Sequence, residues 1–126
     1  MKILLVEDDG GSRDILLEHL GARGWQVASA PDPARGLRLL EAEAPDLVLT
    51  DIHMPGARGT DHVRAFCAGA GGHVPAVVVM TGFPSLESCL DSFAAGAAGY
   101  LVKPFRVAEF VALAEKVMAR RLSLLK

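Results

Sequence analysis

Each of four short apolar runs in the sequence ends on a side chain that can hold a cation or a phosphoryl group. These ends are Glu7, Asp8 and Asp9 after the run at 3–6, Asp51 after 47–50, Thr81 after 77–80, and Lys103 after 99–102. If the runs are neighbouring parallel strands, their carboxyl ends meet at one edge of the sheet, which is where open α/β sheets bind ligands. Acids, a hydroxyl and an ammonium would then share one crevice.

The elements that would position these residues alternate along the chain. Apolar, strand-like runs fall near 2–7, 25–29, 46–51, 76–81 and 99–103, and segments of helical period fall near 11–22, 33–43, 59–69, 86–95 and 106–122. Five such βα units in 126 residues predict one α/β domain over 1–126, with a parallel sheet covered by helices on both faces. The run at 25–29 alternates in polarity more than the others, which favours an edge strand.

Helix-start signals support this division. Asp32 followed by Pro33 predicts an N-cap and a first helical residue. Ser85 predicts the cap of a helix with a single apolar stripe, formed by Leu86, Leu90, Phe93 and Ala94. The last helix carries a similar stripe, and its length suggests that it projects beyond the sheet or leads into a linker.

Composition and charge exclude several classes of function. The net charge of −2 and the scattered basic residues argue against a nucleic-acid surface. No apolar run approaches the about 20 residues that cross a bilayer, so a cytoplasmic location without membrane contact is expected. Cys67 and Cys89 are isolated, which predicts reduced, partly buried thiols, and the four histidines form no metal-binding motif.

The acids after the first strand predict a cation site. Three adjacent acids repel one another if they are buried without a counter-charge. Mg²⁺ would offset this repulsion, because it takes oxygen ligands that usually include one or two carboxylates. Asp8 and Asp51 would supply two carboxylates, and Glu7 would hold a bound water. Alternatively, the acids only favour the dipole of the next helix, a role that Asp9 would fill for the helix beginning near Gly11.

Asp51 has the position of a nucleophile. A carboxylate can attack a phosphoryl group to give an acyl phosphate, a reaction that depends on charge neutralisation and in-line positioning. The metal and Lys103 would neutralise charge, Thr81 would donate its hydroxyl to a phosphoryl oxygen, and the backbone near Gly82 would add further donors. Taken singly, Asp51 also fits a turn residue, Lys103 a solvated lysine and Thr81 a turn hydroxyl.

Two features flank Lys103. The Lys103-Pro104 bond is a candidate cis peptide that would aim the ammonium toward the crevice. Tyr100 lies just before Lys103, so its ring could swing between solvent and the space near Thr81. Ordinary core packing is the alternative role of Tyr100.

Taken together, these segments resemble the receiver domain of two-component response regulators. The resemblance covers essentially the whole chain and is carried by four motifs in order: Leu4-Leu5-Val6-Glu7-Asp8-Asp9, Leu47-Val48-Leu49-Thr50-Asp51-Ile52-His53-Met54-Pro55-Gly56, Val79-Met80-Thr81-Gly82, and Ala97-Ala98-Gly99-Tyr100-Leu101-Val102-Lys103-Pro104-Phe105. The resemblance implies a flavodoxin-like, doubly wound (βα)5 fold with strand order 2-1-3-4-5.

The resemblance also implies a role for each site residue. Asp51 would be the phosphoacceptor. The Mg²⁺ ligands would be Glu7, Asp8, Asp51 and the backbone carbonyl of His53, the phosphoryl contacts would be Thr81 and Lys103, and the switch would be Thr81 with Tyr100. The domain would transfer signals and would not be an enzyme beyond catalysing its own phosphorylation and dephosphorylation.

The implied partners are proteins. The phosphoryl donor would be a sensor histidine kinase or a phosphotransfer protein. The output surface would comprise the elements at 86–95, 99–103 and 106–122 and would contact a downstream effector domain or protein. A homodimer through the last two helices is possible, and no DNA binding is expected of this domain.

Three positions depart from the expected pattern. Gly10-Gly11 predicts an unusually flexible turn after the acids. Phe83 is bulky where a phosphoryl group on Asp51 would meet solvent, and His53 flanks the same opening. We expect Phe83 and His53 to control the attack of water on the acyl phosphate.

Two other classes of protein fit parts of the pattern. A Mg²⁺-dependent phosphatase with an aspartyl nucleophile needs an acid two residues after that Asp, where this chain has His53, and it needs a cap insertion that the chain lacks. A phosphorylation-independent interaction module on the same fold would not need the acids, Asp51, Thr81 and Lys103, all of which are present.

Overall fold

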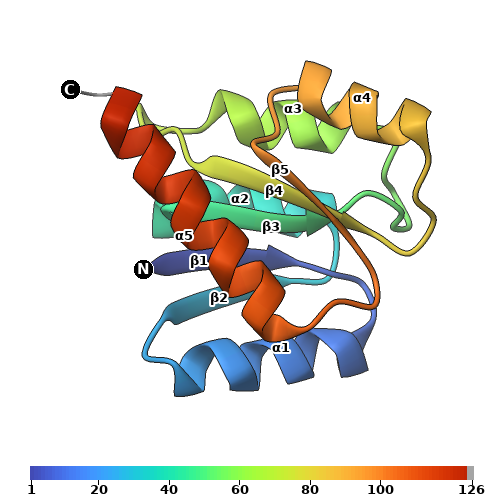
Figure 1. Ribbon diagram of the computed structural model, residues 1–126. Helices are drawn as coiled ribbons and strands as arrows, with labels where there is room; N and C mark the ends of the chain where they lie inside the picture. Colours follow the sequence, from blue (N-terminus) through green and yellow to red (C-terminus); the bar gives the residue numbers. More distant parts are fainter. Residues whose placement is uncertain (125–126) are drawn as a thin grey trace.

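The computed structural model describes residues 1–124 and shows a five-stranded parallel sheet between two layers of helices (Figure 1). The strands are β1 (Lys2–Val6), β2 (Gln26–Ala30), β3 (Leu47–Asp51), β4 (Ala76–Thr81) and β5 (Gly99–Val102). The helices are α1 (Gly10–Ala22), α2 (Pro33–Glu43), α3 (Asp61–Ala68), α4 (Leu86–Ala94) and α5 (Val107–Leu124). The strand order is β2-β1-β3-β4-β5, which confirms the predicted flavodoxin-like fold. Leu125 and Lys126, included in the predicted domain, lie outside the described residues.

The burial of each strand follows its place in the sheet. Every residue of β3 and β4 is buried, because helices cover both faces of these central strands. The edge strands β2 and β5 are only partly buried, as the alternating sequence predicted for β2. No helix among residues 1–124 combines the length and the apolar character that spanning a membrane requires.

Two apolar cores lie on opposite faces of the sheet. On one face α1 and α5 pack through Leu16, Leu20, Phe110 and Ala114 (Figure 1). On the other face α2 and α3 pack through Leu40, Val63 and Phe66. A Cβ atom at Gly36 would lie 2.9 Å from the Phe66 ring, so a glycine is needed for α2 to approach α3 this closely.

Three helices begin with side-chain caps, of which the sequence predicted those at Asp32 and Ser85, while Asp9 was expected only to favour the helix dipole. The side chains of Asp9, Asp32 and Ser85 each accept a hydrogen bond from a backbone N–H in the first turn of α1, α2 and α4. The prediction of a flexible turn at Gly10-Gly11 was wrong, because both glycines belong to the first turn of α1. The Asp9 cap provides enough order for the helix to start directly after the acids.

The apolar stripe of α4 faces solvent. Leu86, Leu90 and Phe93 are 76%, 59% and 47% exposed, and Ser92 is the residue of α4 that is buried. Val102, on the neighbouring edge strand β5, is also exposed. The stripe that predicted this helix from its periodicity therefore contributes to a surface and not to the core.

The single tryptophan lies at the amino end of the sheet. Trp25 immediately precedes β2 and packs edge-on against Phe110 of α5, with 6.4 Å between ring centroids. The Arg23 guanidinium lies 5.5 Å from the centre of the Trp25 ring. These contacts place Trp25 at the opposite end of the strands from the acidic residues.

Candidate functional site

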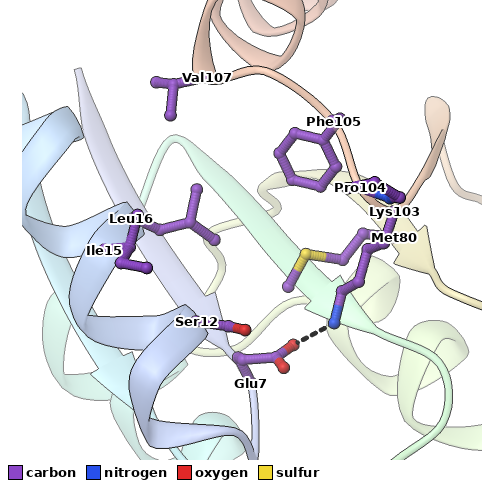
Figure 2. A pocket seen from close by; sticks show the side chains of 9 residues that line it. All are labelled: Glu7, Ser12, Ile15, Leu16, Met80, Lys103, Pro104, Phe105 and Val107. Atoms are coloured by element: carbon purple, nitrogen blue, oxygen red, sulfur yellow. Dashed lines mark hydrogen bonds and ion pairs between the residues drawn. The ribbon is translucent and has the colours of Figure 1, made fainter.

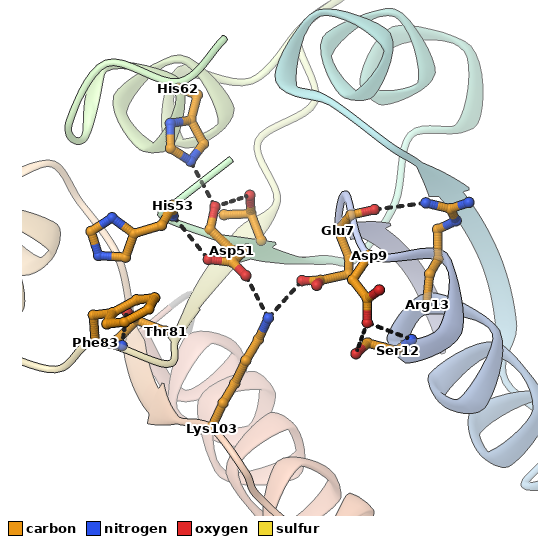
Figure 3. Close-up of polar contacts among 11 residues, drawn as sticks. Glu7, Asp9, Ser12, Arg13, Asp51, His53, His62, Thr81, Phe83 and Lys103 are labelled. Carbon is orange, nitrogen blue, oxygen red and sulfur yellow. Dashed lines mark hydrogen bonds and ion pairs between the residues drawn. The ribbon is translucent and has the colours of Figure 1, made fainter. Parts of the chain in front are cut away.

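The predicted site residues converge at the carboxyl edge of the sheet (Figure 3). The strand register sets their neighbours: Thr50 pairs with Val6, Asp51 with Met80, and Thr81 with Val102. Glu7 therefore follows β1 beside Asp51 of β3, and Lys103 follows β5 beside Thr81 of β4. The crevice is formed where the strand order reverses, since β1 leads outward to β2 and β3 leads outward to β4.

Lys103 links the two buried acids of this crevice. Its Nζ donates to Oε2 of Glu7 at 2.8 Å and to Oδ2 of Asp51 at 2.5 Å (Figure 3). The Glu7 side chain is 2% exposed and that of Asp51 is 7% exposed, whereas the lysine remains 25% exposed. The Lys103-Pro104 bond is cis, as predicted. Lys103 is therefore the positive charge that balances both buried carboxylates.

Burial and neighbouring charges act in opposite directions on these groups. Burial raises the pKa of Glu7, the nearby Asp51 carboxylate adds to this rise, and the bond from Lys103 opposes it. Burial alone would lower the pKa of Lys103, but the bonds from its ammonium to Asp51 and Glu7 outweigh burial and raise that pKa. The two carboxylates therefore favour the charged form of Lys103, while ionisation of Glu7 is made costly by burial.

The acids have the donor set of a divalent-cation site. Glu7, Asp8 and Asp51 each offer a carboxylate oxygen, and these three oxygens lie within 4.8 Å of one another. Asp8 is exposed and gives the cluster an open side, whereas Glu7 and Asp51 are buried. Three carboxylates around one lysine leave an excess of negative charge, which suits a hard cation with oxygen ligands. The backbone carbonyl of His53 stays a predicted ligand.

Residues 3–115 match the family described as the response regulator receiver domain. The chain belongs to this family. Over 120 residues the receiver domain is 37% identical to the transcriptional regulatory protein PrrA of Mycobacterium tuberculosis, a match that covers 95% of this chain and 51% of PrrA. The chain thus spans about half the length of the curated relatives it matches.

Solved structures show the same fold. A CheY-like response regulator receiver domain protein from Methanospirillum hungatei matches with a TM-score of 0.85 and 30% identity, covering 97% of both chains. A response regulator from Burkholderia pseudomallei, solved with a phosphorylated aspartic acid, a calcium ion and citrate, matches with a TM-score of 0.82 and 25% identity. That match covers 95% of this chain and 72% of the Burkholderia chain.

Thr81 and Phe83 shape the mouth of the crevice in this receiver domain. Thr81 is buried, and its hydroxyl oxygen accepts a hydrogen bond of 3.0 Å from the backbone N–H of Phe83. The exposed Phe83 ring meets the His53 ring edge-on, with 5.7 Å between centroids (Figure 3). The two rings thus lie together beside the carboxylate of Asp51, whose Oδ1 accepts a 2.9 Å bond from the backbone N–H of His53.

Tyr100 is attached to α4 by a hydrogen bond that the sequence analysis missed. Its hydroxyl lies 2.6 Å from Oγ of Ser88, and both residues are half-buried. The backbone carbonyl of Ser88 accepts a further bond from the hydroxyl of Ser92, which is buried. Tyr100 is therefore held against the helix that carries the exposed apolar stripe.

His62 was also missed, because no histidine motif marks it. It lies in the first turn of α3, is buried, and its Nε2 is 2.9 Å from the backbone carbonyl oxygen of Asp51. Its Nδ1 is buried without a hydrogen-bond partner within residues 1–124. Burial lowers the pKa of His62, although the nearby Asp51 backbone and carboxylate oppose that change.

A groove opens beside the acidic cluster. It has a volume of about 480 Å³ and lies between α1 and the segment that joins β5 to α5 (Figure 2). Ile15 and Leu16 of α1 face Phe105 across it, while Glu7 and Lys103 contribute its polar end. The groove is therefore apolar along α1 and Phe105 and ends at the ion pair of Glu7 and Lys103.

Proposed function

We propose that this receiver domain accepts a phosphoryl group on Asp51 from the phosphohistidine of a sensor histidine kinase or a phosphotransfer protein. The observation that carries the proposal is the contact of Lys103 with both Asp51 and Glu7 in a crevice with a third acid, Asp8. The structure with a phosphorylated aspartic acid and a calcium ion among the matched proteins supports the same chemistry. The location is expected to be cytoplasmic.

The reaction exchanges one bond to phosphorus for another. An oxygen of the Asp51 carboxylate forms a bond to phosphorus as the bond between phosphorus and the donor nitrogen breaks, and the electron pair leaves with that nitrogen. Lys103 stabilises the charge on the transferred oxygens, and the Thr81 hydroxyl, whose oxygen accepts the bond from the Phe83 N–H, donates its proton to one of them. Glu7, Asp8 and Asp51 would hold Mg²⁺, which when bound would neutralise negative charge at the phosphoryl oxygens.

The added negative charge would change the positions of the switch residues Thr81 and Tyr100. When Thr81 and Lys103 move toward the phosphoryl group, Tyr100 can leave Ser88 and occupy the space that Thr81 vacates. The surface of α4, β5 and α5 then changes, which alters its fit to an effector domain or a second copy of the chain. This is a shift between two populations biased by local charge. The complete set of acids, Thr81 and Lys103 supports this function over that of a phosphorylation-independent module.

Incubation with acetyl phosphate tests the proposal directly. In the presence of Mg²⁺ the intact protein should gain the mass of one phosphoryl group, because the small donor needs no kinase. Excess EDTA should prevent the gain, since Glu7, Asp8 and Asp51 would then repel the donor without a cation between them. If no mass is gained with Mg²⁺, or if EDTA has no effect, the proposed function is wrong.

We expect Phe83→Ala and His53→Ala to shorten the lifetime of the phosphorylated protein several-fold. Either change removes one ring of the pair beside Asp51 and so opens a path for water. The lifetime can be followed by loss of the added mass after the donor is removed by gel filtration. Leu86→Ala is the matched control, because Leu86 is as exposed as Phe83 but lies on α4. Unchanged lifetimes in both variants would show that Phe83 and His53 do not control the attack of water on the acyl phosphate.

Ser88→Ala should release Tyr100 before any phosphorylation. The chain has one tyrosine, so fluorotyrosine labelling gives a single ¹⁹F resonance that reports Tyr100 alone. Loss of a hydrogen bond worth about 1 kcal/mol changes a population ratio about five-fold, so the resonance should move toward its position in the phosphorylated protein. Ser123→Ala, at the exposed end of α5, should not move it. A resonance that stays in place in Ser88→Ala would show that this bond does not hold the ring.

A further inference from the structure

The peptide unit that follows the phosphoacceptor is held from two sides. On one side, the N–H of Ile52 donates to the carbonyl of Met80 on β4 at 3.2 Å. On the other side, the carbonyl oxygen of Asp51 lies 2.9 Å from Nε2 of His62 on α3 (Figure 3). The hydroxyl of Thr50 adds a longer bond of 3.1 Å to the same oxygen. The orientation of this peptide unit is therefore set jointly by β4 and α3.

The imidazole can act here only as a donor through Nε2. A carbonyl oxygen has no proton to give, so the contact requires the proton to be on Nε2. The neutral ring then leaves Nδ1 as a bare lone pair, which matches a buried atom without a partner within residues 1–124. The opposite tautomer would bury an unpaired N–H and face two lone pairs toward each other, which is far more costly.

The position of the ring is fixed by the core. His62 meets Phe66, one helical turn further along α3, edge-on at 6.3 Å between centroids. Phe66 is fully buried, lies close to Gly36 of α2, and belongs to the same core cluster as Val6 of β1. The N-cap of α3, Thr60, makes no side-chain capping bond. The bond from His62 thus joins the uncapped first turn of α3 to the end of β3.

We propose that His62 is a positioning residue for phosphorylation: by donating Nε2–H to the Asp51 carbonyl it fixes the backbone that orients the nucleophilic carboxylate. The next N–H along the chain, that of His53, donates to Oδ1 of Asp51 at 2.9 Å, so a rotated peptide at 51–52 would also displace this bond. His62 contacts neither the phosphoryl group nor the cation in this assignment. The inference rests on the proposed function of Asp51.

Glutamine and asparagine form a matched pair of replacements. The side-chain nitrogen of glutamine is separated from Cβ by the same number of bonds as Nε2 of histidine, whereas that of asparagine corresponds to Nδ1. His62→Gln therefore keeps a donor within reach of the Asp51 carbonyl, and His62→Asn does not. Both variants are polar and lose the ring contact with Phe66, so a general loss of packing affects both.

The rate constant of phosphorylation is measured with acetyl phosphate at saturating Mg²⁺, at a temperature where circular dichroism shows all variants to be folded. His62→Asn should react about five-fold more slowly than the wild type, because the loss of one hydrogen bond worth about 1 kcal/mol corresponds to about a five-fold change. His62→Gln should stay within about two-fold of the wild type. Equal losses in both variants, or no loss in either, would overturn the proposal.

Backbone NMR gives a second measurement that needs no phosphoryl transfer. The amide resonances of Ile52 and His53 should shift in His62→Asn and remain close to the wild type in His62→Gln. The imidazole ¹⁵N spectrum of the wild type should show the proton of His62 on Nε2, and a proton on Nδ1 would contradict the assignment. If the wild type accepts no phosphoryl group, the proposed function fails, while these resonances still decide whether His62 fixes the peptide.

Discussion

Asp51→Asn should abolish phosphoryl incorporation from acetyl phosphate. The asparagine side chain offers only an amide nitrogen and a carbonyl oxygen, which are poor nucleophiles toward phosphorus. The carboxylate that it replaces is a better nucleophile and points from the end of β3 into the crevice. The variant keeps the bond from Lys103 to Glu7, so the crevice should stay folded. Intact-mass measurement should show at least a hundred-fold less modified protein than the wild type under matched conditions.

Asp61→Asn is the control for this experiment. Asp61 is an exposed acid in the first turn of α3, close in sequence to Asp51, and the same chemical change there should leave labelling intact. Tandem mass spectrometry should locate the group on the peptide that contains Asp51. Labelling of Asp51→Asn at the wild-type level, on any other residue, would overturn the assignment of the phosphoacceptor.

Lys103→Met should destabilise the metal-free protein and strengthen its binding of Mg²⁺. Without the ammonium, Glu7 and Asp51 are two buried carboxylates with no balancing charge. Removing the lysine from its buried ion pairs is costly, because it leaves the carboxylates without a partner. Since Lys103 is one-quarter exposed, we expect a loss of about 2 kcal/mol in the free energy of unfolding. Mg²⁺ at about one hundred times its Kd should raise the free energy of unfolding of the variant by about 2.7 kcal/mol.

The affinity for Mg²⁺ should rise in the same variant. Lys103 occupies the carboxylates that would bind the cation, so its removal relieves repulsion between two positive charges. We expect about tenfold tighter binding, equivalent to about 1.4 kcal/mol, measured by calorimetric titration. Lys116→Met, an exposed lysine on α5, should change neither quantity. If Lys103→Met is as stable as the wild type without metal, the lysine does not neutralise this cluster.

The sequence predicted the fold and the placement of the site residues because both depend on local patterns. Strand ends are visible as the last residue of an apolar run, and the parallel arrangement brings Glu7, Asp51, Thr81 and Lys103 to one edge. The caps at Asp32 and Ser85 are also local, since each bond spans three residues. The boundaries of the elements agree to within two residues.

Other features depend on contacts between distant segments or on tertiary burial. The bond from His62 to the Asp51 carbonyl joins residues on two elements, and a single histidine between Asp61 and Val63 carries no sign of it. The pairing of Ser88 with Tyr100 likewise depends on how α4 lies against β5. Periodicity identified the stripe of α4 but not the side it faces, because a helix at the edge of a sheet is covered only in part.

The place of Trp25 decides what ordinary fluorescence can report about this protein. The indole ring contacts Phe110 and Arg23 at the end of the strands farthest from the acids, so its emission should change little when Mg²⁺ is added. Unfolding separates α5 from the start of β2 and should change that emission strongly. Trp25 emission therefore reports whether the protein is folded and should change little with the state of the site. It can serve as an internal reference for folding in any titration of the site.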